Sequence, residues 1–164
     1  MTNIHLVVMG VAGCGKSAVA RELHERLGWP TAEGDEFHSA ANIAKMSAGV
    51  PLVDADRWPW LDAITEWTAV QDAAGHSTIV SCSALRRSYR DRLRAVPGRT
   101  VFLHLVGSPE LLTARIGARS GHFMPASLLA SQLATYEPLQ ADDDWFAVDI
   151  ARPVAEIAAV AITE

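Results

Sequence analysis

The 164-residue chain has little of several features that would each point to a class of protein. Its two cysteines, Cys14 and Cys82, are too few for a disulfide framework. No apolar run approaches the roughly 18 residues of a membrane-spanning helix, and residues 1–9 lack the basic and long apolar segments of a signal peptide. Basic residues are the minority, 14 Lys and Arg against 19 Asp and Glu, and the formal net charge of −5 disfavours a broad nucleic-acid surface. These deficits predict a cytoplasmic protein with reduced thiols that binds neither nucleic acid nor membrane.

What is present is an ordinary globular composition, 49% hydrophobic and 20% charged, at a length that suits a single domain over residues 1–164. Short apolar runs alternate with longer segments that repeat apolar residues at helical spacing. The runs expected to form buried strands are 4–9, 78–82, 100–106 and 145–150, with 31–34 as a weaker candidate. The expected helices are 16–27, 54–74, 83–93, 108–116 and 153–162. This alternation predicts an α/β fold in which a parallel five-stranded sheet lies between two layers of helices.

The stretch GVAGCGKSAVA directly follows the first expected strand. Its glycines and the Lys16-Ser17 pair fit the pattern G-x-x-x-x-G-K-[ST] of a phosphate-binding P-loop, and the expected strand before and helix after it disfavour a chance match. In such a loop the backbone N–H groups surround the phosphates, the lysine reaches the β- and γ-phosphates, and the serine hydroxyl ligates Mg²⁺. The sequence therefore predicts an ATP and Mg²⁺ site. The residues expected to form it are Gly10, Val11, Ala12, Gly13, Cys14, Gly15, Lys16, Ser17 and Ala18.

A P-loop alone does not distinguish a kinase from a GTPase or a motor, but the GTPase pattern N-K-x-D is absent and the chain is short for a motor. Asp35 follows the weaker candidate strand, and residues just past the carboxyl end of a parallel strand face the ligand crevice. We expect Asp35 to orient or deprotonate an acceptor hydroxyl. The alternative is a solvated turn residue or a helix cap.

Basic residues near the expected crevice predict an anionic acceptor. The candidates for holding it are Lys45, Arg57, Arg86 and Arg87, since arginine can grip a carboxylate through two hydrogen bonds. The alternative for each is a solvated surface charge. The segment that begins at Arg115 is expected to be a mobile lid over about 117–126, in which Arg115 and Arg119 close over the transferring phosphate.

Five stretches together resemble the bacterial-type gluconokinases of the P-loop kinase superfamily. They are GVAGCGKSAVA, EGDEFH, NIAKMSAGVPLVDADRWPWL, CSALRRSYRDRLR and GHFMPASLLASQLATYEPL. The resemblance runs through nearly the whole chain and implies ATP-dependent phosphorylation of D-gluconate at its 6-hydroxyl. It also implies a shikimate-kinase-like core, a closing lid and a homodimer. It adds His38, Ser83 and His122 to the residues expected to contact gluconate, and it agrees with the role expected of Asp35.

Two alternative hypotheses about the function remain open at this point. Another small-molecule kinase of shikimate or adenylylsulfate type would share the core, although Ser81-Cys82-Ser83-Ala84 stands where a shikimate kinase has a Gly-Gly-Gly run. A nucleotide-binding regulatory module without turnover is the other. The intact Lys16, Ser17 and Asp35 argue against it.

Overall fold

The computed structural model describes residues 2–11, 14–50, 52–118, 132–140 and 144–163. Its centre is a sheet of five parallel strands in the order β2-β3-β1-β4-β5. The strands are β1 (Ile4–Met9), β2 (Thr31–Glu33), β3 (Thr78–Ser81), β4 (Arg99–Val106) and β5 (Trp145–Asp149). The predicted α/β fold with a parallel five-stranded sheet is confirmed.

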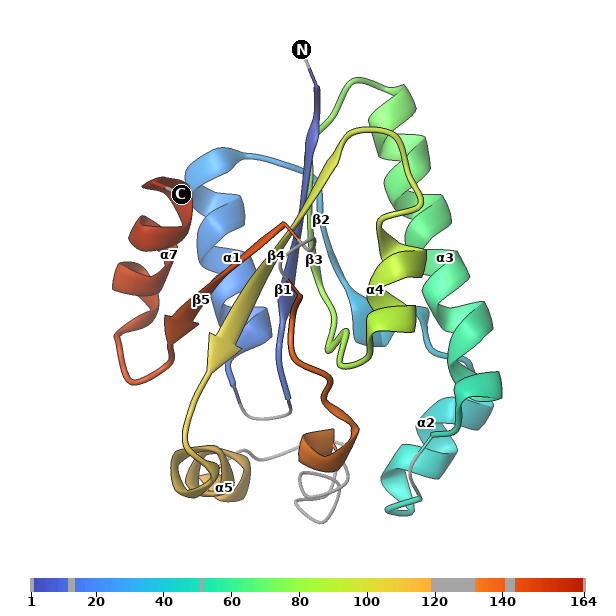
Figure 1. Cartoon of the computed structure of the whole chain (residues 1–164), viewed down its shortest axis with the longest axis vertical. Coiled ribbons are helices and arrows are strands. Elements are labelled where there is room, and N and C mark those ends of the chain that lie inside the picture. The colour runs from blue at the N-terminus through green and yellow to red at the C-terminus, as the bar shows by residue number, and fades with distance from the viewer. Residues whose placement is uncertain (1, 12–13, 51, 119–131, 141–143, 164) are drawn as a thin grey trace.

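Helices cover both faces of this sheet (Figure 1). Helices α1 (Lys16–Leu27) and α7 (Val154–Thr163) lie together on one face, and α3 (Asp54–Ala73) and α4 (Arg87–Leu93) lie on the other. The 3₁₀ helix η1 (Gly34–Phe37), α2 (Ala40–Ser47) and α5 (Pro109–Ala118) lie near the carboxyl ends of the strands. Among the described residues, no helix is both long enough and apolar enough to span a membrane.

Successive side chains of β1 point to opposite faces of the sheet, and each face has its own hydrophobic cluster. Leu6 and Val8 belong to the cluster under α1 and α7, whereas Val7 and Met9 belong to the cluster under α3 and α4. The residues of this central strand from His5 to Met9 are therefore buried whichever way they point, which explains why all of them except the hydrogen-bonded His5 are apolar.

Three expectations need correction. The helix expected over 83–93 begins only at Arg87, because Ala84 has a φ of 48° and Arg86 is extended, so neither continues a helix backwards. The strand expected to be fully buried over 145–150 is the sheet edge, and its residues alternate between exposed and less exposed. Helix α2 was not expected at all. It begins after Ser39, whose hydroxyl accepts a hydrogen bond from the Asn42 N–H.

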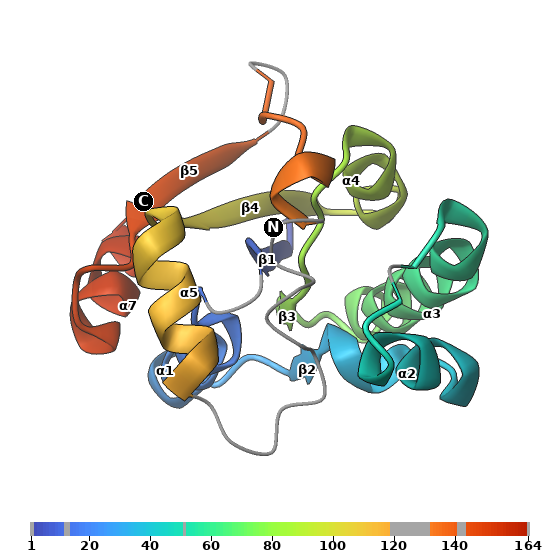
Figure 2. The ribbon, with the colours of Figure 1, turned by 90° about the horizontal axis from the view of Figure 1, so that it is seen from below.

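Because all five strands run the same way, the segments that follow them meet at one edge of the sheet, which Figure 2 views. The central strand β1 pairs with β3 on one side and β4 on the other, and open parallel sheets bind ligands beyond the carboxyl end of the strand where the order changes direction in this way. The P-loop leaves β1 at this point.

Candidate active site

The described part of the P-loop joins β1 to α1 and is folded around the Lys16 ammonium. This Nζ donates to the carbonyls of Gly10 and Val11, at 3.0 and 3.2 Å. A Cβ on Gly10 would lie 2.7 Å from Cys14 Sγ and 2.9 Å from the Leu105 carbonyl, so only glycine fits there. Cys14 is buried and fills the loop, as a small apolar residue would.

Ser17 follows Lys16 in the first turn of α1, where backbone N–H groups point toward the crevice. The structure thus brings the lysine, the serine hydroxyl and the positive end of a helix to the carboxyl end of β1. Ala12 and Gly13 lie outside the described residues.

Asp35 is placed by a close contact between backbones. A Cβ on Gly34 would lie 2.4 Å from the Ser81 carbonyl at the end of β3, so the chain can turn here only with glycine. The Gly34 carbonyl also accepts a 2.7 Å hydrogen bond from Trp60 Nε1. Both contacts hold η1 against the sheet, and the Asp35 side chain, 48% exposed, is left at the crevice.

His38 lies beneath Asp35 in a nearly closed setting. Its imidazole stacks on Trp60 at 4.2 Å between ring centres, and Nε2 lies 4.0 Å from Asp35 Oδ1. Asn42 Nδ2 lies 3.3 Å from His38 Nδ1. Burial lowers the pKa of His38 below its usual 6.5, so the ring is uncharged at neutral pH.

Arg57 and Arg86 approach the same carboxylate. Arg57 Nη1 lies 3.9 Å from Asp54 Oδ1, and Arg86 Nη1 lies 3.8 Å from Asp54 Oδ2. The Tyr89 hydroxyl donates to Asp54 Oδ1 at 2.5 Å and accepts from Arg57 Nη1 at 3.0 Å. Burial and the neighbouring carboxylate raise the pKa of Tyr89 to about 12, so this hydroxyl keeps its proton. Two cations from different elements thus share one anchor at the start of α3.

The P-loop, η1 and α3 converge near Cys82. Burial raises the pKa of this thiol to about 12, and the charges of Lys16, Asp35 and Arg57 all act on it. Ser83 follows directly, and its carbonyl accepts a hydrogen bond from the Gly10 N–H at 3.3 Å. Candidate phosphate-binding and acceptor-binding groups therefore lie around Cys82, just beyond the end of β3.

The remaining predicted site residues are either paired elsewhere or not fully described by the structure. Lys45 Nζ binds both Asp56 oxygens, at 2.9 and 3.1 Å, and Asp56 also accepts from the Val53 N–H at the start of α3. This pairing gives Lys45 a structural partner, and its contact with an acceptor stays a prediction. Arg115 lies within α5, but its side chain is not among the described ones. Arg119, His122 and the expected lid from 119 to 126 lie outside the described residues.

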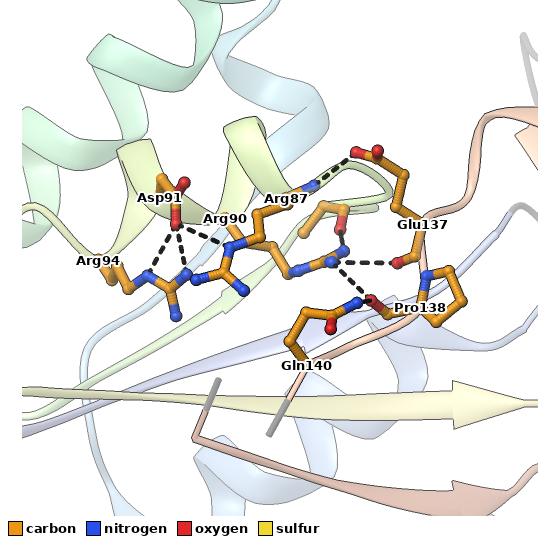
Figure 3. A network of polar contacts seen from close by, with 8 residues as sticks. Arg87, Arg90, Asp91, Arg94, Glu137, Pro138 and Gln140 are labelled. Atoms are coloured by element: carbon orange, nitrogen blue, oxygen red, sulfur yellow. Dashed lines mark hydrogen bonds and ion pairs between the residues drawn. The ribbon is translucent and has the colours of Figure 1, made fainter. Parts of the chain in front are cut away.

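Sequence reasoning missed Arg90, which is completely buried in α4. Its guanidinium donates to the carbonyls of Ala84, Glu137 and Pro138, as Figure 3 shows. The run CSALRRSYRDRLR contains Arg90 among five arginines, and no local feature of that run marks this one as buried. Only the tertiary fold distinguishes it from the other four arginines, which are partly or fully exposed.

No group of three or more His, Cys, Asp or Glu side chains that could hold a metal occurs among the described residues. Mg²⁺ keeps several waters and binds through few protein ligands together with substrate phosphates, so a single serine hydroxyl beside bound phosphates suits this ion.

Comparison with known proteins agrees with this geometry. The family model described as an AAA domain matches residues 6–139. A gluconokinase of Gluconobacter oxydans is 52% identical over 139 residues, which make up 85% of this chain and 78% of that protein. The chain belongs to the gluconokinase family.

Two crystal structures are similar to this member of the gluconokinase family over nearly its whole length. A sugar kinase of Janibacter sp. HTCC2649 superposes with a TM-score of 0.94 at 48% identity, covering 98% of this chain and 93% of that one. A gluconokinase of Sinorhizobium meliloti 1021 superposes with a TM-score of 0.86 at 49% identity, covering 97% and 89%. The resemblance found in the sequence is therefore confirmed, and neither the other kinase types nor a silent module is favoured.

Proposed function

We propose that the protein transfers the γ-phosphoryl group of ATP to the 6-hydroxyl of D-gluconate, giving 6-phospho-D-gluconate and ADP. The observation that carries this proposal is the convergence of Arg57 and Arg86 on Asp54, with Arg57, the P-loop lysine and Asp35 all near Cys82. A phosphate site beside two arginines and a carboxylate suits an acceptor that has a carboxylate at one end and a hydroxyl at the other. Membership of the gluconokinase family supports the same acceptor.

In the proposed reaction the 6-hydroxyl oxygen bonds to the γ-phosphorus as the bond from that phosphorus to the bridging oxygen of ADP breaks. Asp35 orients the hydroxyl and accepts its proton late in the transfer. His38, uncharged at neutral pH, lies beside Asp35 with Nε2 4.0 Å from Asp35 Oδ1. Lys16 leaves the loop carbonyls to bind the β- and γ-phosphates and stabilises the charge that develops on them.

Mg²⁺ would be held by the Ser17 hydroxyl together with phosphate oxygens and water. When bound, it neutralises phosphate charge during the transfer.

Arg57 and Arg86 are proposed to hold the gluconate carboxylate, with Lys45, Ser83 and His38 lining the same pocket and His122 contacting the acceptor from the lid. Arg115 and Arg119 are proposed to close over the phosphates. We further propose one catalytic domain over residues 1–164, a lid over about 117–126, a homodimer and a cytoplasmic location.

The test is a coupled assay of ADP release with ATP and Mg²⁺ over a panel of acceptors. Gluconate should stimulate release strongly, whereas glucose, which has the hydroxyls but no carboxylate, should be a very poor acceptor. Shikimate and adenylylsulfate separate the other kinase types. Equal rates with gluconate and glucose, or release that no acceptor stimulates, would reject the proposal.

A further inference from the structure

We propose that Arg90 is a positioning residue for the acceptor site: it fixes the backbone turn that carries Ser83 and Arg86. The kinetic part of this inference rests on the function proposed above. The structural part does not, since it concerns contacts among described residues.

The guanidinium of Arg90 joins two segments that lie far apart in the sequence. Nη1 donates to the Ala84 carbonyl at 2.9 Å, and Nη2 donates to the carbonyls of Glu137 and Pro138 at 3.0 and 3.3 Å. Figure 3 shows the side chain lying between the turn before α4 and the segment at 137–140. A planar fork of donors can serve two directions at once, which a lysine ammonium on a flexible stem does less well.

Two further hydrogen bonds tie the same segments together. The Glu137 N–H donates to the Leu85 carbonyl at 2.7 Å, and the Glu137 carboxylate accepts from the Arg87 N–H at 2.9 Å. The second bond caps the first turn of α4 with a negative charge, which suits a helix N-terminus. Residues 84–87 are therefore held from outside by a segment about fifty positions further along the chain.

This turn has a shape that local sequence does not favour. Ala84 has a φ of 48°, in the left-handed region where a residue with a Cβ pays a conformational cost. The bond from Arg90 to the Ala84 carbonyl stabilises that conformation. Without it, we expect the chain from Ser83 to Arg86 to relax.

The turn connects directly to both sides of the crevice. The Ser83 carbonyl accepts from the Gly10 N–H of the P-loop, and the Arg86 side chain reaches Asp54. A shift of the turn would therefore move Arg86 away from the anchor that it shares with Arg57. The half-buried His104 has its ring 5.1 Å from that of Tyr136, and burial and then the charge of Arg90 lower its pKa to about 4.

The experiment compares Arg90→Lys with Arg92→Lys. Arg92 lies on the same helix, pairs with the exposed Asp62 and is 42% exposed, so its replacement controls for loss of an arginine from α4. Arg90→Lys should raise the KM for gluconate about tenfold and leave the KM for ATP within about twofold, while Arg92→Lys should leave both unchanged. A role in stability alone predicts a lower Tm with both KM values unchanged, and that result would overturn the inference.

Two variants of the exposed Glu137 test the inference if Arg90→Lys does not fold. Glu137 is exposed, so Glu137→Ala should fold and lose the bond to the Arg87 N–H, whereas Glu137→Gln keeps an acceptor oxygen. Glu137→Ala should raise the gluconate KM in the same direction as Arg90→Lys, and Glu137→Gln should restore it. Unchanged gluconate KM in Glu137→Ala would count against the positioning role.

Hydrogen exchange supplies a readout that needs no acceptor. Amides of residues 83–87 and 136–140 should exchange faster in Arg90→Lys, or in Glu137→Ala if the former does not fold, with the rest of the sheet unchanged. Unaltered exchange in both segments would overturn the inference, whatever the acceptor proves to be. If the wild-type protein does not use gluconate, the proposed function fails, and exchange alone decides the role of Arg90.

Discussion

At the scale of single residues, Gly34 sets the path of the backbone and Asp35 supplies the proposed catalytic group. Gly34 lets the backbone approach the Ser81 carbonyl so closely that no side chain would fit, and this contact sets where the next residue lies. The Asp35 side chain contributes little to stability, because it is half exposed and its Oδ1 lies 4.0 Å from Nε2 of His38, too far for a hydrogen bond. The side chain at this position can therefore serve a chemical role with little effect on the free energy of unfolding.

Asp35→Asn should separate the two roles expected of this position. The variant keeps the shape but removes the base and the charge, so kcat should fall by about 10²- to 10⁴-fold while the Tm stays close to that of the wild type. Turnover and thermal unfolding are measured on the same sample. Full activity with a lowered Tm would mean that Asp35 is only a cap, whose loss costs about 1 kcal/mol.

At the scale of elements, the residues proposed to bind the acceptor lie at the starts of two helices. Asp54 and Arg57 lie in the first turn of α3, while Arg86 precedes α4 and Tyr89 lies within it. Packing of α3 against α4 brings these groups together, and Tyr89 bridges Arg57 and Asp54. The proposed acceptor site thus depends on how the two helices pack together rather than on either helix alone.

Arg57→Ala and Arg86→Ala should each raise the KM for gluconate by about ten- to a hundredfold, because a charge-assisted contact is worth about 1.5–3 kcal/mol. The KM for ATP should change far less. Steady-state kinetics with each substrate varied in turn measures both. Arg92→Ala on α4 is the control, and an equal rise in both KM values would show that the arginines do not select the acceptor.

At the amino ends of the strands, away from the candidate site, a polar network links the end of α3 to β1. His5 Nε2 lies 2.8 Å from Asp72 Oδ1, and His5 Nδ1 lies 2.8 Å from the Thr78 hydroxyl. Asn3 Nδ2 donates to the same Asp72 oxygen at 3.0 Å. The bonds from Asn3 and then from His5 hold the pKa of Asp72 below its usual value.

Asp72→Asn should therefore lower the Tm at neutral pH and leave the kcat of the folded protein unchanged. A carboxylate whose pKa is lowered in the folded state contributes stability above its unfolded pKa of about 4, and this contribution disappears as the pH falls through the folded value. The wild type and the variant should converge in acid. Thermal unfolding over a pH series tests this, with Asp62→Asn on the exposed side of α3 as control. A difference that persists in strong acid would contradict it.

At the scale of the whole molecule, ligand binding and folding are linked because the P-loop joins the central strand to a helix that packs on the sheet. Mg-ATP at about a hundred times its Kd should stabilise the fold by about 2.7 kcal/mol. For a protein of this size that corresponds to a rise in Tm of roughly 5–10 °C.

Lys16→Ala should shrink that rise and lower kcat by about 10²-fold, since the ammonium that stabilises the phosphoryl charge is gone. The backbone N–H groups of the loop remain, so a small thermal shift should survive. Thermal unfolding with and without Mg-ATP, alongside the coupled assay, measures both effects. Normal turnover in folded Lys16→Ala would exclude the P-loop role.

The sequence by itself determined the strand–helix order, the P-loop and the place of Asp35, because each depends on local rules. Apolar period, glycine spacing and the common carboxyl edge of parallel strands are all readable along the chain. Its errors came from contacts between segments that lie apart in the sequence. The left-handed Ala84 delayed the start of α4, and the edge position of β5 exposed a strand that was expected to be buried.

Only the tertiary structure decided which charged side chains act together. Arg57 and Arg86 stand 29 positions apart, and their meeting at Asp54 depends on the packing of α3 against α4. Arg90 and Arg92 are near neighbours of one type on one helix, yet one is buried against three carbonyls and the other pairs with Asp62 near solvent. The physical reason is that burial and hydrogen-bond partners come from segments distant in the sequence, and no local pattern encodes which of several arginines will face them.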